Sequence, residues 1–151
     1  MDDAGGEWPY KSEPVMTGEW AGWGRYDTDA FEAMSGPFYG RREPDGSVLC
    51  AFRTERKHMN GGGSIHGGCL VTFADYAIFM IADHVLKDSG SVTASINAEF
   101  LDGVGEGEFV ECRGEVVRAG GSLVVVRGIV STSGRPLLSF SATIKKIRRR
   151  S

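Results

Sequence analysis

Residues 60–75, with the sequence NGGGSIHGGCLVTFAD, join a glycine-rich loop directly to an apolar stretch that continues to about residue 86. Apolar side chains in this stretch recur at spacings of three and four residues, which is the period of an α-helix. They are Leu70, Phe73, Ala74, Ala77, Ile78, Met80, Ile81 and Val85. The pattern predicts a long helix over residues 69–86 that is buried on most sides and ends at residues 87–90, Lys-Asp-Ser-Gly.

The chain on either side of this helix has the composition of β-strands. Runs of β-branched and aromatic residues predict strands at residues 38–42, 47–54, 91–101, 108–118, 122–132 and 136–147. The last four strands are separated by short links that contain glycine, at residues 102–107, 119–121 and 133–135. Because short links join antiparallel neighbours, the pattern predicts an antiparallel meander that curls around one buried helix.

The first part of the chain differs from the rest. Residues 1–28 contain Trp8, Trp20 and Trp23 among many Gly and Glu residues, with no clean period. We interpret this part as an irregular arm that packs its tryptophans on the body of the protein. A short helix is expected at residues 29–35, capped by its first residue, an Asp. The expected organisation is therefore an arm over residues 1–28 and a single domain over residues 29–151.

Composition and charge exclude several classes of protein. The 151 residues include 20 acidic and 17 basic side chains, a net charge of -3 that gives no general attraction to nucleic acid or anionic membranes. Three cysteines, Cys50, Cys69 and Cys112, are too few for a disulfide framework and fit a reducing compartment. The acidic start lacks the apolar segment of a signal peptide, and Asp75 and Asp83 argue against a membrane-spanning helix. We expect a cytoplasmic protein.

Two features of residues 60–75 predict a hydrolytic site. The N–H groups of Gly67, Gly68 and Cys69 lie where the helix begins, and unpaired N–H groups there attract a carbonyl oxygen or an anion. Asp75 lies about two turns later on a largely apolar surface, where burial is expected to raise its pKa. The N–H groups would stabilise an oxyanion, and the carboxylate would activate water or attack directly.

The string HGGCLVTFADYA at residues 66–77 has an Asn six residues before its His and an Asp nine residues after it. In this it resembles the hotdog-fold thioesterase superfamily, and within it the phenylacetate-pathway (PaaI-type) branch. The resemblance covers residues 36–147 and implies an α+β hotdog fold, an antiparallel β-sheet wrapped around one long central helix. It also implies hydrolysis of acyl-CoA thioesters without a metal or cofactor. The implied assembly is a homodimer, often paired into a homotetramer.

The resemblance also implies a role for each matching position. Gly67 would donate its N–H to the thioester carbonyl, and His66 would polarise that carbonyl or position the acyl group. Asn60 would orient the substrate or the water. Asp75 would act as general base or nucleophile from the opposite subunit, beside a hydroxyl at Thr93 or Ser95. Contacts with substrate or CoA are expected from Gly68, Ser95, Arg118, Gly120, Gly121 and Ser122.

Simpler interpretations stay open at several positions. Asp75 could be a structural carboxylate, and Cys69 could be either a nucleophile at a helix start or an apolar filler. Residues 118–122 could form a plain hairpin turn, and the basic residues 148–150 a solvated tail rather than a contact for CoA phosphates. The spacing of the histidines does not match a zinc site, and no Gly-Lys-Ser/Thr ending marks a phosphate loop. The alternative function is a non-catalytic acyl-CoA binding or sensing protein on the same fold.

Overall fold

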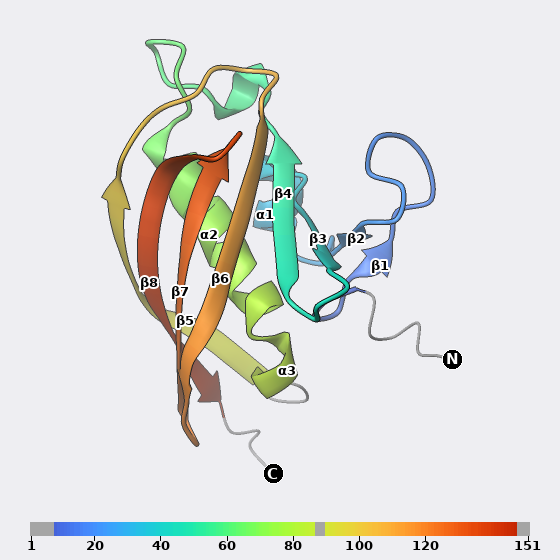
Figure 1. The fold of residues 1–151 in the computed structure, drawn as a ribbon, viewed down its shortest axis with the longest axis vertical. Helices are drawn as coiled ribbons and strands as arrows, with labels where there is room; N and C mark the ends of the chain where they lie inside the picture. Colours follow the sequence, from blue (N-terminus) through green and yellow to red (C-terminus); the bar gives the residue numbers. More distant parts are fainter. Residues whose placement is uncertain (1–7, 87–89, 148–151) are drawn as a thin grey trace.

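The computed structural model describes residues 8–86 and 90–147. An eight-stranded antiparallel sheet curves around one long helix, α2 (Gly67–Ile81), which lies against its concave face (Figure 1). The strand order is β1-β2-β3-β4-β6-β7-β8-β5. The predicted α+β hotdog architecture is confirmed.

The α2 helix starts and stops at different residues from those predicted. It begins at Gly67, two residues early, because the His66 side chain caps it by accepting a hydrogen bond from the Gly68 N–H. It ends at Ile81 with Ala82 as its C-cap, and a separate four-residue helix, α3 (Asp83–Leu86), follows. The predicted end at residues 87–90 falls largely outside the described residues. The apolar periodicity runs through Ala82 without a sign of the break, so the sequence predicted one helix where two are formed.

The helix is buried on most sides, as its composition predicted. Its buried side chains include Leu70, Phe73, Tyr76, Ile78 and Met80, which pack on helix-facing residues of β4, β6, β7 and β8. The other seven positions are partly open or exposed: Gly67, Gly68 and Cys69 in the first turn, and then Val71, Thr72, Asp75 and Phe79. Gly68, Thr72, Asp75 and Phe79 are three or four residues apart, so they form a stripe along the helix, with Val71 beside it. Asp75 is therefore on the one side of α2 that the sheet leaves accessible.

The strand pairing corrects the predicted meander. The hairpins β6–β7 and β7–β8 are present, formed by β6 (Phe109–Ala119), β7 (Leu123–Thr132) and β8 (Arg135–Ile147). However, β5 (Gly90–Phe100) pairs with β8, and β6 pairs with β4 (Val48–Arg53). Residues 101–108 therefore cross the end of the sheet instead of forming a tight turn, as the loop at the top of Figure 1 shows.

Chain length explains why this crossing is possible. Eight extended residues can reach about 26 Å. The three inter-strand spacings between β5 and β6 add up to only about 14 Å. A short link rich in glycine thus allowed a hairpin without requiring one, and the pairing was decided by how the strands surround α2.

The arm contributes to the same sheet. It contains the short strands β1 (Glu13–Pro14) and β2 (Gly24–Arg25), and β2 pairs with β3 (Tyr39–Arg42). The Trp20 ring stacks on Tyr39 with 4.3 Å between ring centroids, and Trp23 is buried beside it. This aromatic cluster covers the face of the sheet that is turned away from α2. The division of the chain at residue 28 stays a prediction, since the arm adds strands to the sheet of the body.

The helix α1 (Ala30–Ser35) lies beside α2 and begins where predicted. The side chain of Asp29 caps it by accepting a hydrogen bond from the Glu32 N–H at 3.0 Å. This cap fixes the first turn of α1 and brings the Glu32 position close to the accessible stripe of α2.

Two glycines face each other across β6 and β7, and substitution of one of them should destabilise the sheet. A Cβ at Gly128 would lie 2.6 Å from Cζ of Phe140 and 2.8 Å from the Arg113 carbonyl oxygen. We expect Gly128→Ala to lower the free energy of unfolding by about 1–3 kcal/mol, because a backbone atom and a buried ring must move. Urea denaturation would measure this loss. Gly121→Ala is the matched control, since a Cβ there meets nothing within 4 Å; equal stability of the two variants would contradict the prediction.

Candidate functional site

The loop before α2 is held by its own polar groups. Oδ1 of Asn60 accepts hydrogen bonds from the N–H groups of Gly62 at 2.9 Å and Ser64 at 3.1 Å. Ile65 is buried, and its N–H donates to the Val104 carbonyl at 2.8 Å. The side-chain oxygen of Asn60 is thus used within the loop. The side-chain NH₂ group of Asn60 is exposed and is the part that can contact a ligand.

The His66 ring has a defined donor and acceptor. Its Nδ1 accepts a hydrogen bond from the Gly68 N–H at 2.8 Å. In the neutral ring the proton must then be on Nε2, so the exposed edge of His66 presents a donor. The Gly68 N–H, which the sequence suggested as a contact for substrate, is already used by this cap.

The Gly67 N–H is the donor that remains at the start of α2. Among the described residues, no acceptor is within hydrogen-bonding distance of it, whereas the N–H groups of Cys69 and Leu70 both donate to the His66 carbonyl. Gly67 is also packed closely, because a Cβ there would lie 2.9 Å from Cε1 of Phe100. An unpaired N–H at the positive end of a helix can polarise a carbonyl oxygen.

Asp75 is half-buried and paired with a hydroxyl. The Thr93 Oγ1–H donates to Oδ1 of Asp75 at 2.5 Å. Burial raises the pKa of Asp75, the hydrogen bond from Thr93 opposes that rise, and the negative charge of Asp29 adds to it. The second carboxylate oxygen, Oδ2, has no partner among the described residues and is free to take a proton.

Two cavities meet at this carboxylate. One has a volume of 350 Å³ and extends toward Tyr10, Tyr26 and Ser91; the other has a volume of 220 Å³ and extends toward Phe31 and Thr72. Both are lined by Asp29, Glu32, Asp75 and Thr93. A third cavity, of 490 Å³, lies beside His66 and Gly68 and shares Phe31 and Thr72 with the second. The accessible stripe of α2 therefore runs from the helix start to Asp75 beneath α1.

Two of these residues were not predicted as part of a site. Glu32 and Asp29 were expected only as parts of a short helix, and no motif connects them with Asp75. Proximity in a cavity between two helices is a tertiary feature, and no spacing along the chain encodes it. The local signal was the helix cap at Asp29, which implies that Glu32, three residues later, lies in the first turn of α1.

One chain cannot bring Gly67 and Asp75 to the same carbonyl group. Asp75 lies eight residues after Gly67 on α2, which corresponds to about 12 Å along the helix axis. A base and an oxyanion donor must both reach atoms bonded to one carbonyl carbon, within about 3 Å of each. The two ends of the predicted site are thus well formed in one chain but separated.

The remaining predicted contacts lie elsewhere. A β-bulge between Thr93 and Ser95 changes the alternation of β5, so Thr93 lies against Asp75 while Ser95 is exposed. The hairpin that contains Arg118, Gly120, Gly121 and Ser122 is at the opposite end of the sheet from the start of α2 (Figure 1). Burial raises the pKa of Cys69 to about 11, which disfavours a thiolate nucleophile there. The basic residues 148–150 lie outside the described residues.

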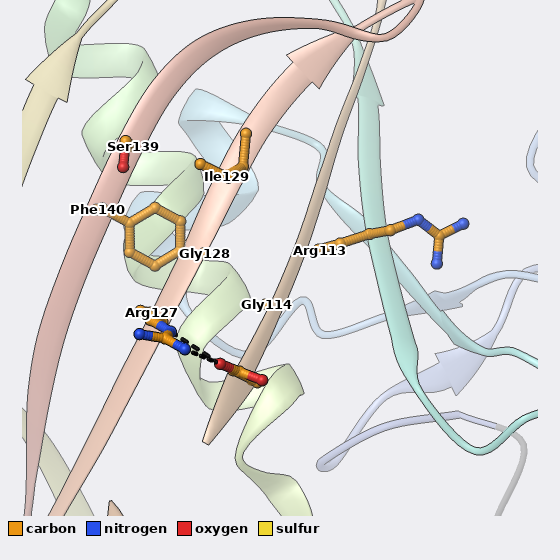
Figure 2. Close-up of a pocket in the computed structure, with 8 residues that line it drawn as sticks. Arg113, Gly114, Arg127, Gly128, Ile129, Ser139 and Phe140 are labelled. Carbon is orange, nitrogen blue, oxygen red and sulfur yellow. Dashed lines mark hydrogen bonds and ion pairs between the residues drawn. The ribbon is translucent and has the colours of Figure 1, made fainter. Parts of the chain in front are cut away.

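A pocket on the outer face of the sheet has different chemistry. Its volume is 420 Å³, and it lies over the backbone of Gly114 and Gly128. Arg127 and Glu115 form an ion pair at 2.6 Å. Figure 2 shows Arg127 over the outer face of β7 and Arg113 extending toward β4. Arg113 in turn pairs with Glu43 at 3.2 Å. The single carboxylate of the pocket, Glu115, is exposed and neutralised by Arg127, so it is a poor candidate for the base of hydrolysis.

In residues 8–86 and 90–147, no three His, Cys, Asp or Glu side chains are placed together as a metal site would need. No described helix is both long enough and apolar enough to cross a lipid bilayer.

The amino-acid sequence matches a known protein family and a curated relative. Residues 62–139, more than half of the chain, match the model of the thioesterase superfamily. A proposed esterase of Pseudomonas aeruginosa is 27% identical over 109 residues, which cover 72% of this chain and 81% of that protein.

Two solved structures share the fold. A hypothetical thioesterase of Streptococcus pneumoniae, crystallised with coenzyme A, is 22% identical with a TM-score of 0.68, and the match covers 80% of this chain and 95% of that one. The PaaI protein of the phenylacetic acid degradation operon of E. coli is 19% identical with a TM-score of 0.70, covering 82% and 88%. The predicted resemblance to the hotdog-fold thioesterases is confirmed.

The hydrogen bond between Thr93 and Asp75 can be tested without an activity assay. Thr93→Val keeps the shape of the side chain but removes the donor to the charged form of Asp75, so the pKa of Asp75 should rise further. Thr93→Ser keeps the hydroxyl and should leave that pKa nearer to the wild-type value. Titration of ¹³C-labelled aspartate carboxyl groups by NMR would measure both variants. The same Asp75 midpoint in the two variants would contradict the assigned contact.

Proposed function

Since this chain belongs to the thioesterase superfamily, we propose that it hydrolyses acyl-CoA thioesters to a free carboxylic acid and CoA. The observation that carries the proposal is Asp75, a half-buried carboxylate that receives a hydrogen bond from Thr93 and borders two cavities. The coenzyme A in the similar thioesterase of Streptococcus pneumoniae supports CoA as the thiol part of the substrate.

The start of α2 would act on the thioester carbonyl. The Gly67 N–H would donate to the carbonyl oxygen, and Nε2–H of His66 is available as a second donor. The positive end of the helix dipole favours the negative charge that develops on this oxygen during attack. Asn60, through its exposed amide NH₂, would orient the substrate or the water.

Asp75 would supply the base. Its Oδ2 would take a proton from a water molecule, whose oxygen then bonds to the carbonyl carbon. As the tetrahedral intermediate collapses, the C–S bond breaks, and the CoA thiolate leaves and receives that proton from Asp75. Direct attack by the carboxylate is the other route, through an anhydride that water then hydrolyses. In both, Thr93 holds Oδ1 and so fixes the orientation of Oδ2.

A complete site would need two copies of the chain. Gly67 and Asp75 are about 12 Å apart along one helix, so the donor of one subunit would meet the base of the other in a homodimer. The unpaired edge of β5 and its exposed Val92 and Phe100 support such an interface. In that arrangement Arg118 and residues 120–122 of a partner could reach CoA, and two dimers could pair into a tetramer.

The role of Asp75 is tested by removing its charge. Asp75→Asn should reduce kcat/KM for acyl-CoA hydrolysis by about 10²-fold or more, because an amide cannot take a proton from water. Thiol release from a panel of aromatic, branched and straight-chain acyl-CoAs would be followed, with Glu106→Gln as an exposed control. Retention of activity within a few-fold would contradict the role. A wild-type protein that binds acyl-CoAs without releasing thiol would instead be a non-catalytic binding protein.

The division of the site between subunits predicts complementation. Gly67→Pro removes the N–H at the first position of α2, where proline fits, and His66 before it already has the extended backbone that proline requires, with ψ of 135°. Gly67→Ala keeps the N–H and controls for contact with Phe100; it should be far more active than Gly67→Pro.

Mixed dimers of Gly67→Pro and Asp75→Asn should regain activity. If both variants are refolded together in equal amounts, half of the dimers are mixed, and each of these has one intact site of two. The expected activity is about a quarter of the wild-type value. No recovery in verified mixed dimers would show that the site is not shared in this way.

A further inference from the structure

Glu32 lies in the same cavities as the proposed base. It belongs to α1, and its side chain lines both the 350 Å³ and the 220 Å³ cavities together with Asp75 and Thr93. Its own N–H is held by the Asp29 cap, so the position of Glu32 relative to α2 is set by the first turn of α1. Two carboxyl groups from two helices therefore line the same two cavities.

No positively charged side chain of the described residues is paired with either carboxyl group. Among the same residues, the Glu32 carboxyl has no hydrogen-bond donor. The titratable groups that line the 350 Å³ cavity with it are Asp29, Asp75, Tyr10, Tyr26 and Tyr76, and Cys50 is buried nearby in β4. Lys57, which lies outside α1, contacts this helix near its C-terminal end, where its Nζ donates to the Met34 carbonyl at 3.0 Å. Burial first, and then the charges of Asp29 and Asp75, raise the pKa of Glu32 to about 8.

The hydrogen bonds decide which carboxyl group holds the proton. Asp75 receives a hydrogen bond from Thr93, and a donor of this kind stabilises the charged form. Glu32 receives none among the described residues. Because two carboxylates in one poorly solvated space cannot both ionise without a large cost, the proton stays on the group without a donor.

We propose that Glu32 is a positioning residue of the Asp75 site, which keeps its proton at neutral pH so that the pair has a single negative charge, on Asp75. The inference rests on the proposed function in that Asp75 is the base. A protonated Glu32 leaves Asp75 ionised and ready to accept a proton from water. It also keeps the cavity from acquiring a second charge that would repel Asp75 from its position beside Thr93.

The loss of this proton should be visible as an alkaline limit on activity. As the pH rises through about 8, Glu32 ionises and the carboxyl pair repels itself. In wild-type protein kcat/KM should fall roughly tenfold between pH 7 and pH 9. Glu32→Gln keeps a neutral side chain at every pH, so its profile, normalised to its own maximum, should change less than twofold over the same range. Glu106→Gln is the exposed control and should follow the wild-type profile, after subtraction of uncatalysed thioester hydrolysis.

Stability should respond to the same proton, but over a lower pH range. The folded protein binds the Glu32 proton up to about pH 8, whereas the unfolded chain loses it near the ordinary glutamate pKa of 4.5. Between these values the folded state holds more protons, so the free energy of unfolding should decline as the pH rises. This decline should be smaller in Glu32→Gln. If Glu32 were only structural, the substitution would change stability but leave the alkaline limit on activity unchanged, and the proposal would fail.

A direct titration separates this inference from the proposed function. In wild-type protein, ¹³C-labelled Glu32 should titrate near pH 8, and in Asp75→Asn its midpoint should move down because the neighbouring charge is gone. A wild-type midpoint close to the ordinary glutamate pKa of 4.5 would overturn the proposal even if acyl-CoA hydrolysis is found. Absence of hydrolysis with a Glu32 midpoint near 8 would instead overturn the proposed function and leave the shared proton established.

Discussion

The burial of α2 against the concave face of the sheet is the constraint on which the rest of the structure depends. Nearly every side chain of the helix is apolar or small, and eight of its fifteen residues are buried. Such a helix is stable only where apolar surfaces cover it on most sides, because about 25 cal/mol is gained for each Å² of apolar surface removed from water. The curvature of the sheet, the crossing of residues 101–108 and the position of β5 all serve this covering.

The same packing fixes the chemistry that the protein can perform. The sheet leaves one stripe of α2 accessible, and Asp75 lies on that stripe between Thr72 and Phe79. A carboxylate at this place is partly desolvated, which makes it a stronger base than an exposed aspartate, and Thr93 stabilises its charged form. Placing α1 over the stripe adds Glu32 and Asp29 and encloses the space further. The nearby carboxyl groups disfavour each other's charge, and perturbed carboxyl groups of this kind are concentrated at functional sites.

The start of α2 shows how one residue can have two effects. His66 ends the glycine-rich loop and caps the helix through Nδ1, and this contact turns its Nε2 outward as a donor. The cap uses the Gly68 N–H and leaves the Gly67 N–H as the unpaired group at the helix end. The donor and the base then lie at different heights on one rigid helix. Since a helix cannot shorten this separation, a second copy of the chain provides the simplest way to bring them together.

The sequence by itself determined the features that depend on local pattern. The period of Leu70, Phe73, Ala77 and Met80 predicted the buried helix, β-branched runs predicted the strands, and the spacing of Asn60, His66 and Asp75 indicated the family. These signals are short-range, so they can be read along the chain. Tertiary structure alone decided the pairing of β5 with β8, the break at Ala82, the choice of Thr93 over Ser95 by a β-bulge, and the meeting of Glu32 with Asp75. Each of these depends on contacts between segments distant in the chain, where packing around α2 outweighs local preference.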